Sequence, residues 1–237
     1  MPHRRRRQAG RSAPILVVTG LSREARCVGR EGVETLCSGA DPAFLRSALR
    51  EKARSSYAAV VSFGLAGGLC PKLRPGDAVL GMRALGDAEA IEAHSELSDL
   101  IHHGFHGAGV HMRRGAVAGV DRPAMTVAGK AELRERRDAI VVDMESHIAG
   151  AFAQEKDLPF AIVRVACDPA ERALPALAAR AIKRDGGVDL PLVLRELARE
   201  PGQLARLIRA GLDSGAAFKT LRRCGPLLGP LFGLVSA

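Results

Sequence analysis

The sequence predicts an α/β protein built around one buried sheet, and three observations support this fold class. The chain has 237 residues, which is enough for one α/β domain with a full core. Hydrophobic residues make up 47% of the chain but aromatic residues only 3%, so the core is aliphatic, as in sheets buried on both faces. Two apolar, β-branched runs at 139–143 and 160–168 flank a helical pattern, which predicts a βαβ unit.

The first half of the chain alternates strand and helix signals. A strand is predicted at 14–19, and a helix begins within 23–30. Asp41 and Pro42 form an N-cap followed by a proline at the first helical position, so a helix is predicted from there to about residue 54. The next predicted elements are a buried strand at 58–63, a glycine-rich turn at 64–69 and a strand at 78–81.

The second half contains the βαβ unit and an Arg- and Leu-rich end. The stretch 89–109 has no clear period, and a strand at 116–120 and a helix at 128–137 follow it. Leucines and arginines at helical spacing predict amphipathic helices over 188–223. We divide the chain into a basic disordered tail at 1–13, a domain at 14–187, and an amphipathic helical extension at 188–237 that packs on the same domain.

The net charge of +9 does not by itself predict a nucleic-acid partner. Much of the excess lies in the arginine run at 4–7, which is typical of a solvated tail. Because Tyr57 is the only tyrosine and no basic stretch is interleaved with aromatics, stacking on bases is not expected. For the arginine-bearing helices, packing on the sheet is favoured, and a weak association with an anionic membrane surface is the alternative.

Cysteine usage and the lack of long apolar runs predict a cytoplasmic protein, with attachment to the periphery of the inner membrane left open. The five cysteines include no pair at CxxC spacing, which favours reduced thiols. The apolar run at 13–18 is too short for a signal peptide. The apolar end at 224–237 is short and contains Pro226 and Pro230, so it is not expected to span a bilayer.

Two carboxylates are the first candidates for chemistry. Glu145 follows one strand of the predicted βαβ unit, and Asp168 ends the other. Open α/β folds bind ligands at the carboxyl ends of their strands, so we expect both side chains to face one small molecule. This placement indicates an enzyme.

Three motifs at 60–77, 142–145 and 164–168 together resemble the nucleoside phosphorylase and nucleosidase superfamily. They read Val-Val-Ser-Phe-Gly-Leu-Ala-Gly-Gly-Leu with a later Leu-Arg-Pro-Gly-Asp, then Val-Asp-Met-Glu, then Arg-Val-Ala-Cys-Asp, and the resemblance covers 14–168. It implies a single-domain three-layer α/β/α fold with a central twisted mixed sheet, in which 14–187 is the catalytic domain. It also implies a homo-oligomer with no cofactor and with phosphate as a co-substrate.

A narrower resemblance is to the hopanoid-associated phosphorylases. It is carried by the segments at 19–25, 143–147 and 164–175 and by the basic, Leu-rich helices near the C-terminus. It implies release of adenine from adenosylhopane by phosphorolysis, in hopanoid side-chain biosynthesis. The alternative is a hydrolytic nucleosidase for methylthioadenosine or S-adenosylhomocysteine. A binding module that kept the fold and lost the activity is the alternative of a different class.

The chemistry of adenine release assigns roles to the carboxylates. Asp168 is the candidate acid for N7 of the leaving purine; otherwise it is a turn or helix-capping residue. Glu145 is the candidate acceptor for the ribose hydroxyls; otherwise it is a first-turn glutamate favoured by the helix dipole. Met144 packs against the sugar or fills the core, and Asp143 is expected to cap a helix.

The resemblance implies that Glu24 and Arg164 hold the attacking water; otherwise they form a structural ion pair. Gly64 begins a turn that presents N–H groups to an anion or only packs closely. Leu65 stands where relatives often have a small polar residue, which puts phosphate binding in doubt and leaves the nucleophile open. Arg23 is the candidate that compensates as a phosphate ligand.

The base pocket and metal binding complete the expectations. Relatives stack adenine on an aromatic residue, but residues 119–125 contain none, so Phe63 or Met125 is proposed to line the base instead. Four histidines lie at 94–106 without a carboxylate or cysteine that completes a metal site, so no metal is expected.

Overall fold

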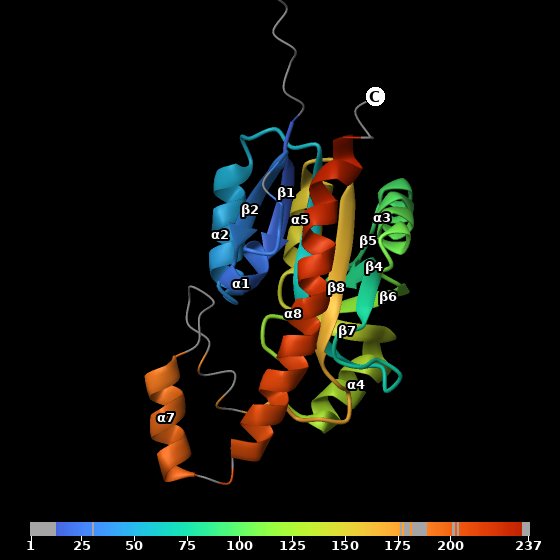
Figure 1. Ribbon diagram of the computed structural model, residues 1–237. Coiled ribbons are helices and arrows are strands. Elements are labelled where there is room, and N and C mark those ends of the chain that lie inside the picture. The colour runs from blue at the N-terminus through green and yellow to red at the C-terminus, as the bar shows by residue number, and fades with distance from the viewer. Residues whose placement is uncertain are drawn as a thin grey trace, which may run out of the picture.

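A computed structural model of the chain confirms the three-layer α/β fold (Figure 1). It describes residues 13–29, 31–175, 177, 181, 189–200, 202 and 204–233. The predicted tail lies outside these residues, apart from Ala13. A mixed sheet of eight strands lies between two layers of helices.

The elements follow one another along the chain in the order expected of an α/β protein. The strands are β1 (Ile15–Thr19), β2 (Val33–Cys37), β3 (Ala59–Gly68), β4 (Ala78–Leu85), β5 (Ala90–Glu92), β6 (Met112–Gly119), β7 (Ala139–Asp143) and β8 (Phe160–Asp168). The helices are α1 (Ser22–Ala25), α2 (Pro42–Lys52), α3 (Ser95–Gly107), α4 (Val127–Arg137), α5 (Ser146–Glu155), α7 (Leu190–Arg199) and α8 (Leu204–Gly233).

The sheet order corrects the predicted βαβ unit. The strands run β2-β1-β3-β7-β6-β4-β5, and β8 pairs with both β3 and β4. Within the described sheet, β8 lies parallel to β3, whereas β7 meets the last residues of β3 in antiparallel orientation. The two strands are therefore not neighbours in a parallel pair. The pairing of β3 with β8 continues across a bulge between Ala66 and Gly67, and Gly67 pairs with both β8 and β7.

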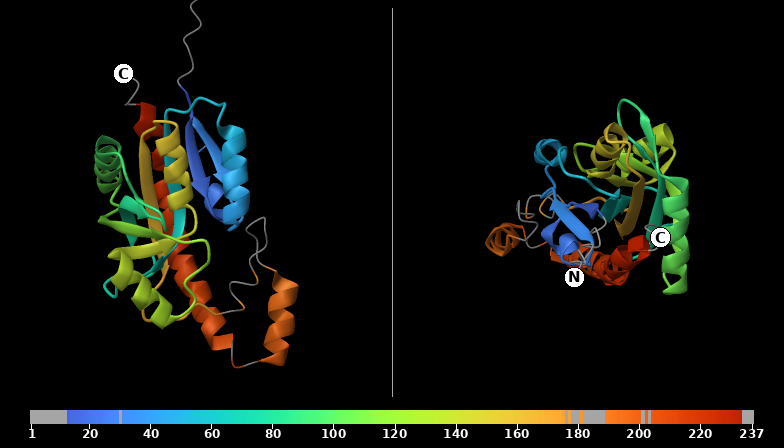
Figure 2. Two further views of the ribbon diagram at one scale, coloured as in Figure 1. Left: turned by 180° about the vertical axis from the view of Figure 1, so that it is seen from behind. Right: turned by 90° about the horizontal axis from the view of Figure 1, so that it is seen from above.

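Helices cover both faces of the sheet, as the aliphatic core requires. On one face, α3 and α8 pack on alternate residues of β1, β3, β4 and β8, with Phe105 and Leu221 completely buried. On the other face, α2 and α5 pack on the intervening residues, with Leu45 and Ala149 completely buried. Figure 2 shows these layers from behind and from above, with α4 below β6 and β7.

The predicted glycine-rich turn at 64–69 is wrong, because β3 continues through it to Gly68. The glycines allow close approach instead of a turn. A Cβ on Gly64 would lie 2.7 Å from Oε2 of Glu24, and one on Gly68 would lie 2.7 Å from the carbonyl oxygen of Asp168. The functional groups therefore reach the strand because these positions lack side chains.

The helical end of the chain differs from the prediction in length. The amphipathic pattern forms α7 and α8, but α8 continues past Arg223 through Pro226 and Pro230. It runs along β8 and α3, whereas α7 stands apart from the sheet in both views (Figures 1 and 2). Among the described residues, no helix is long and apolar enough to cross a membrane.

Candidate active site

A cavity of about 500 Å³ opens where the carboxyl ends of β1, β3, β7 and β8 converge. Its polar side is formed by the turn after β1, the end of β3, the β7–α5 turn and the end of β8. Residues of α7 and α8 line the opposite side. Glu145 and Asp168 both line this cavity, although their strands are not paired as predicted.

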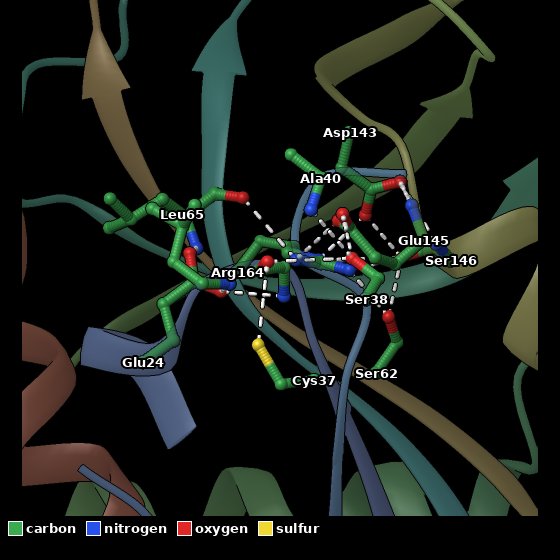
Figure 3. Close-up of polar contacts among 12 residues, drawn as sticks. Glu24, Cys37, Ser38, Ala40, Ser62, Leu65, Asp143, Glu145, Ser146 and Arg164 are labelled. Carbon is green, nitrogen blue, oxygen red and sulfur yellow. Dashed lines mark hydrogen bonds and ion pairs between the residues drawn. The ribbon is translucent and has the colours of Figure 1, made fainter. Parts of the chain in front are cut away.

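Arg164 of β8 holds the polar side together (Figure 3). Its side chain is completely buried, and its Nε lies 2.6 Å from Oδ2 of Asp143. Its Nη1 lies 3.5 Å from Oε2 of Glu145, and its Nη2 donates to Oγ of Ser62 at 2.5 Å. A buried guanidinium requires such partners, because an unpaired charge inside a protein is costly.

Asp143 serves the helix as well as Arg164. Its Oδ1 accepts the backbone N–H groups of Ser146 at 3.0 Å and Glu145 at 3.3 Å. These bonds satisfy donors at the start of α5, as the helix-capping expectation requires. The same carboxylate thus fixes the turn that carries Glu145 and Met144 into the cavity wall.

Glu24 occupies a nest of backbone N–H groups rather than an ion pair. Its Oε2 accepts from Gly20 at 2.7 Å and from Leu21 at 2.8 Å, and its Oε1 accepts from Leu65 at 2.8 Å. Among the described residues, the carboxylates within ion-pair distance of Arg164 are Asp143 and Glu145, so the alternative of a structural ion pair with Glu24 is not formed. The N–H group of Leu65, expected to face an anionic ligand, is bound by a carboxylate of the chain itself.

One guanidinium therefore faces three buried carboxyl groups, and this imbalance shifts their protonation. Burial raises the pKa of Glu145 to about 7; Arg164 opposes the shift, and Asp143 and Glu24 add to it. Burial also raises the pKa of Glu24, although Arg164 and the backbone N–H groups that bind Glu24 act to lower it. Glu145 also accepts a hydrogen bond from Oγ of Ser38 at 3.1 Å. Glu145 can therefore exchange a proton near neutral pH.

Asp168 has a buried partner that the sequence reasoning missed. Its Oδ2 forms an ion pair with Nζ of Lys130, a residue of α4 whose side chain is 1% exposed. The sequence carried a weak signal, because Lys130 precedes Leu133 by three residues and so shares the apolar face of the predicted helix. The sequence pattern is equally typical of a lysine whose ammonium group is exposed to solvent.

The remaining predicted residues divide between the cavity and the core. Met144, Leu65 and Arg23 line the cavity. Phe63 does not: it is completely buried in the core beneath α3 and α8. Neither Met125 nor Gly64 lies among the described lining residues, and the backbone of Gly64 instead packs against Glu24 and Arg164.

Phe218 of α8 is the aromatic side chain among the described lining residues, and sequence reasoning did not propose it. The guanidinium of Arg23 lies over its ring, 4.0 Å from the centroid. Val120, Pro123 and Ala124, from the segment expected to hold the base, also line the cavity. The remaining wall is aliphatic, with Ala181, Val193, Leu207, Ala210 and Gly211.

The histidines of α3 take no part in this cavity. His94 caps the helix by accepting the N–H of Leu97 at 3.4 Å, and His102 and His106 stack with ring centroids 6.4 Å apart. Within the described part of the chain, no three histidine, cysteine or acidic side chains are grouped so that they could hold a metal ion.

Comparisons with known proteins agree with this architecture. The family model of the phosphorylase superfamily matches residues 47–186, more than half of the chain. No curated protein sequence matches. Among solved structures, the futalosine hydrolase of Helicobacter pylori strain 26695 is similar with a TM-score of 0.68 at 13% identity, covering 94% of this chain and 98% of that one.

Two nucleosidases give similar values. A mutant of the Helicobacter pylori methylthioadenosine/S-adenosylhomocysteine nucleosidase, with 5′-methylthioadenosine in its active site, has a TM-score of 0.68 at 13% identity, covering 94% of this chain and 100% of that one. The Campylobacter jejuni nucleosidase has a TM-score of 0.61 at 15% identity, covering 90% and 99%. At such identities the likeness shows a shared fold. The family match shows that the chain belongs to the phosphorylase superfamily and is an enzyme of the nucleoside phosphorylase and nucleosidase class.

Proposed function

We propose that this enzyme releases adenine from a nucleoside with a large apolar group at its 5′ position, and that water is the attacking group. The observation that carries the proposal is the placement of Glu24, Glu145 and Asp168 around one cavity. Cleavage of an N-glycosidic bond needs a proton for the leaving base and stabilisation of a sugar that becomes cationic. Separate carboxyl groups can supply both.

Each carboxyl group has a proposed part in the reaction. Asp168 gives its proton to N7 of the purine, so that adenine leaves as a neutral molecule. Glu145, fixed by Ser38 and Arg164, accepts hydrogen bonds from the ribose hydroxyls. These bonds strengthen as positive charge develops on the sugar. Met144, beside Glu145 in the cavity wall, packs against the ribose.

Water is favoured over phosphate because of the surroundings of Glu24. Its carboxyl group already binds the N–H groups that an anion would use, and Leu65 offers no hydroxyl. A phosphate dianion in the same cavity would also be repelled by Glu145 and Glu24 whenever these groups are ionised. In the proposed reaction, Glu24 accepts the proton of the attacking water while Arg164 keeps the surrounding carboxyl groups in place.

Phosphorolysis is the second candidate, and one observation favours it. Arg23 lines the cavity and carries the kind of charge that binds phosphate. The narrower sequence resemblance also implies a phosphorylase. One observation speaks against phosphorolysis. The guanidinium of Arg23 lies over the ring of Phe218, so it must move off that ring before it can form bidentate hydrogen bonds with phosphate.

The proposed 5′ substituent follows from the aliphatic wall that α7 and α8 contribute. Methylthioadenosine, bound by one solved relative, carries only a small group at this position. A wall that includes Val193, Leu207 and Ala210 suits a larger apolar group, and burying such a group stabilises the complex. Adenosylhopane is the candidate that the sequence resemblance names, which would place the reaction in hopanoid side-chain biosynthesis.

A comparison of two substrates and two variants tests this proposal. Adenine release is measured with adenosylhopane in detergent and with methylthioadenosine in the same detergent. Leu207→Gln should lower kcat/KM for adenosylhopane by roughly tenfold, because it places an amide against the apolar substituent, and should change methylthioadenosine cleavage far less.

Leu212→Gln is the matched control, since Leu212 lies on the same helix but its side chain is exposed and absent from the cavity wall. Equal effects of Leu207→Gln on both substrates would contradict the role of the aliphatic wall. Failure of the wild-type enzyme to release adenine from either substrate would reject the proposed activity as a whole.

We also propose that the enzyme works in the cytoplasm as a homo-oligomer at the periphery of the inner membrane. The homo-oligomer and the cytoplasmic location rest on the sequence alone, whereas the membrane association is supported by a stripe of exposed apolar side chains on the helices that line the cavity: Leu194, Leu204, Ile208 and Leu212. Exposed arginines on the same helices, Arg195, Arg199 and Arg209, would bind anionic lipid headgroups. A substrate with a lipid substituent could then enter the cavity from the membrane surface.

A further inference from the structure

Lys130 stands out as a completely buried cation outside the network around Arg164. It belongs to α4, whose other Lys and Arg side chains are at least partly exposed. Its ammonium group has three hydrogens and three described partners: Oδ2 of Asp168, and the carbonyl oxygens of Pro169 and Arg172 at 2.9 Å each. Because all three donors are used, Lys130 has none left for a bound nucleoside.

The three partners lie on one short segment at the edge of the cavity. Asp168 ends β8, and Pro169 and Arg172 belong to the turn that follows. The ammonium group therefore ties the carboxylate and its own turn to the same point on α4. This fixes the direction of the Asp168 side chain more firmly than the backbone alone would.

The same contacts give the two oxygens of Asp168 different surroundings. Oδ2 is bound by Lys130, whereas Oδ1 has the weak thiol donor of Cys167 at 3.0 Å. The Asp168 side chain is 15% exposed and lines the cavity. Oδ1 is thus the oxygen available to a purine.

We propose that Lys130 is a positioning residue for the departure of the purine, an inference that rests on the proposed function. In this step Oδ1 of Asp168 first takes a proton from solvent, while Oδ2 keeps its contact with Lys130. The O–H bond at Oδ1 then breaks as an N–H bond forms at N7 of the purine. The carboxylate left behind is paired with the ammonium group of Lys130. Lys130 acts through Asp168 in two ways: it aims Oδ1 at the base, and it stabilises the charge that Asp168 acquires.

A double-mutant cycle tests whether Lys130 acts through Asp168. Wild type, Lys130→Gln, Asp168→Asn and the double variant are compared for kcat and KM of adenine release from methylthioadenosine, a soluble probe. We expect Asp168→Asn to lower kcat by about 10²–10⁴-fold and Lys130→Gln by roughly tenfold to hundredfold, with KM changed by less than about threefold. In the Asp168→Asn background, Lys130→Gln should have an effect within about twofold.

Two further variants separate positioning from loss of fold. Lys130→Arg keeps the charge, although its planar group cannot direct three hydrogens at the same three acceptors, so its kcat should lie between those of wild type and Lys130→Gln. Arg137→Gln is the matched control, since Arg137 lies on α4 and donates to the carbonyl oxygens of Leu85 and Gly119 without contacting Asp168. It should lower the melting temperature and leave kcat nearly unchanged.

The outcomes distinguish the two proposals. If the wild-type enzyme releases adenine from neither methylthioadenosine nor adenosylhopane, the proposed function is rejected; if it cleaves only adenosylhopane, the same cycle is run with that substrate. Suppose that the wild type is active and that Lys130→Gln lowers kcat by the same factor in the wild-type background and in the Asp168→Asn background. In that case Lys130 acts independently of Asp168, and the positioning role is overturned. It is also overturned if a folded Lys130→Gln or Lys130→Arg enzyme keeps wild-type kcat.

Discussion

At the scale of single residues, the charge balance around Arg164 governs the proposed chemistry. Glu24, Asp143 and Glu145 are all buried beside one guanidinium, and only Asp143 lies within 3 Å of it. Asp143 is therefore the structural partner of Arg164. Glu145 and Glu24, with raised pKa values, remain available for binding and proton transfer.

The raised pKa of Glu145 predicts a pH-dependent cost in stability. Its folded-state pKa of about 7 lies above the ordinary glutamate value of 4.5 that applies to the unfolded chain. Between these values the folded protein holds a proton that the unfolded chain has released. The stabilisation is fully present below the lower pKa and is lost as pH rises through the upper one.

Glu145→Gln should remove this dependence, because the amide does not ionise. Compared with wild type, the variant should gain on the order of 1–3 kcal/mol in free energy of unfolding on going from acidic to mildly alkaline pH, as measured by urea unfolding. Glu135→Gln, at an exposed glutamate of α4, should show no such gain. A parallel pH dependence of wild type and Glu145→Gln would mean that Glu145 does not titrate as described.

The sequence could predict some of these residues and not others. Glu145 and Asp168 were proposed because carboxylates at the ends of apolar strands are unusual, whereas Arg164 was proposed from the family resemblance. Phe63 was misplaced because strand periodicity does not say which residues of β3 reach the cavity and which lie beneath the helices. Lys130 and Phe218 approach the cavity through helix packing, which local pattern does not specify.

At the scale of elements, the course of β3 decides how the site is assembled. Its glycines suggested a turn, but pairing of Gly67 with Val142 and Asp168 keeps the segment in the sheet. The glycine content of a segment indicates that its backbone is flexible, but it does not show which strands the segment pairs with. Here that pairing overrides the local preference for a turn. The same limit explains the predicted βαβ unit, since sequence order gave β7 and β8 correctly but not their neighbours in the sheet.

The exposed apolar stripe on α7 and α8 predicts binding to anionic vesicles. In co-sedimentation, the wild-type protein should bind vesicles that contain anionic lipid at low salt and be released at high salt, because arginine contacts are screened. Leu212→Gln should weaken binding by about threefold or more, since an exposed leucine no longer enters the lipid. Leu207→Gln is here the control, because that residue lines the cavity. Absence of binding at low salt would rule out the membrane proposal.

At the scale of the whole molecule, composition and strand signals predicted an α/β fold around one buried sheet, and the family resemblance implied its three-layer arrangement. An aliphatic core of this size needs helices on both faces of the sheet, and α2, α3, α5 and α8 provide them. The converging strand ends then place a polar network on one side of a cavity and the aliphatic helices on the other. This division between a charged and an apolar side is the basis of the proposed substrate.

The most direct test of the account is the phosphate dependence of adenine release by the wild-type enzyme, run in ¹⁸O-labelled water with adenosylhopane and with methylthioadenosine. If water attacks with Glu24 as the base, the rate should change by less than about twofold when phosphate is added, and the label should appear at C1 of the ribosyl product. Adenine release that requires phosphate and yields a sugar 1-phosphate without label would contradict the proposed role of Glu24.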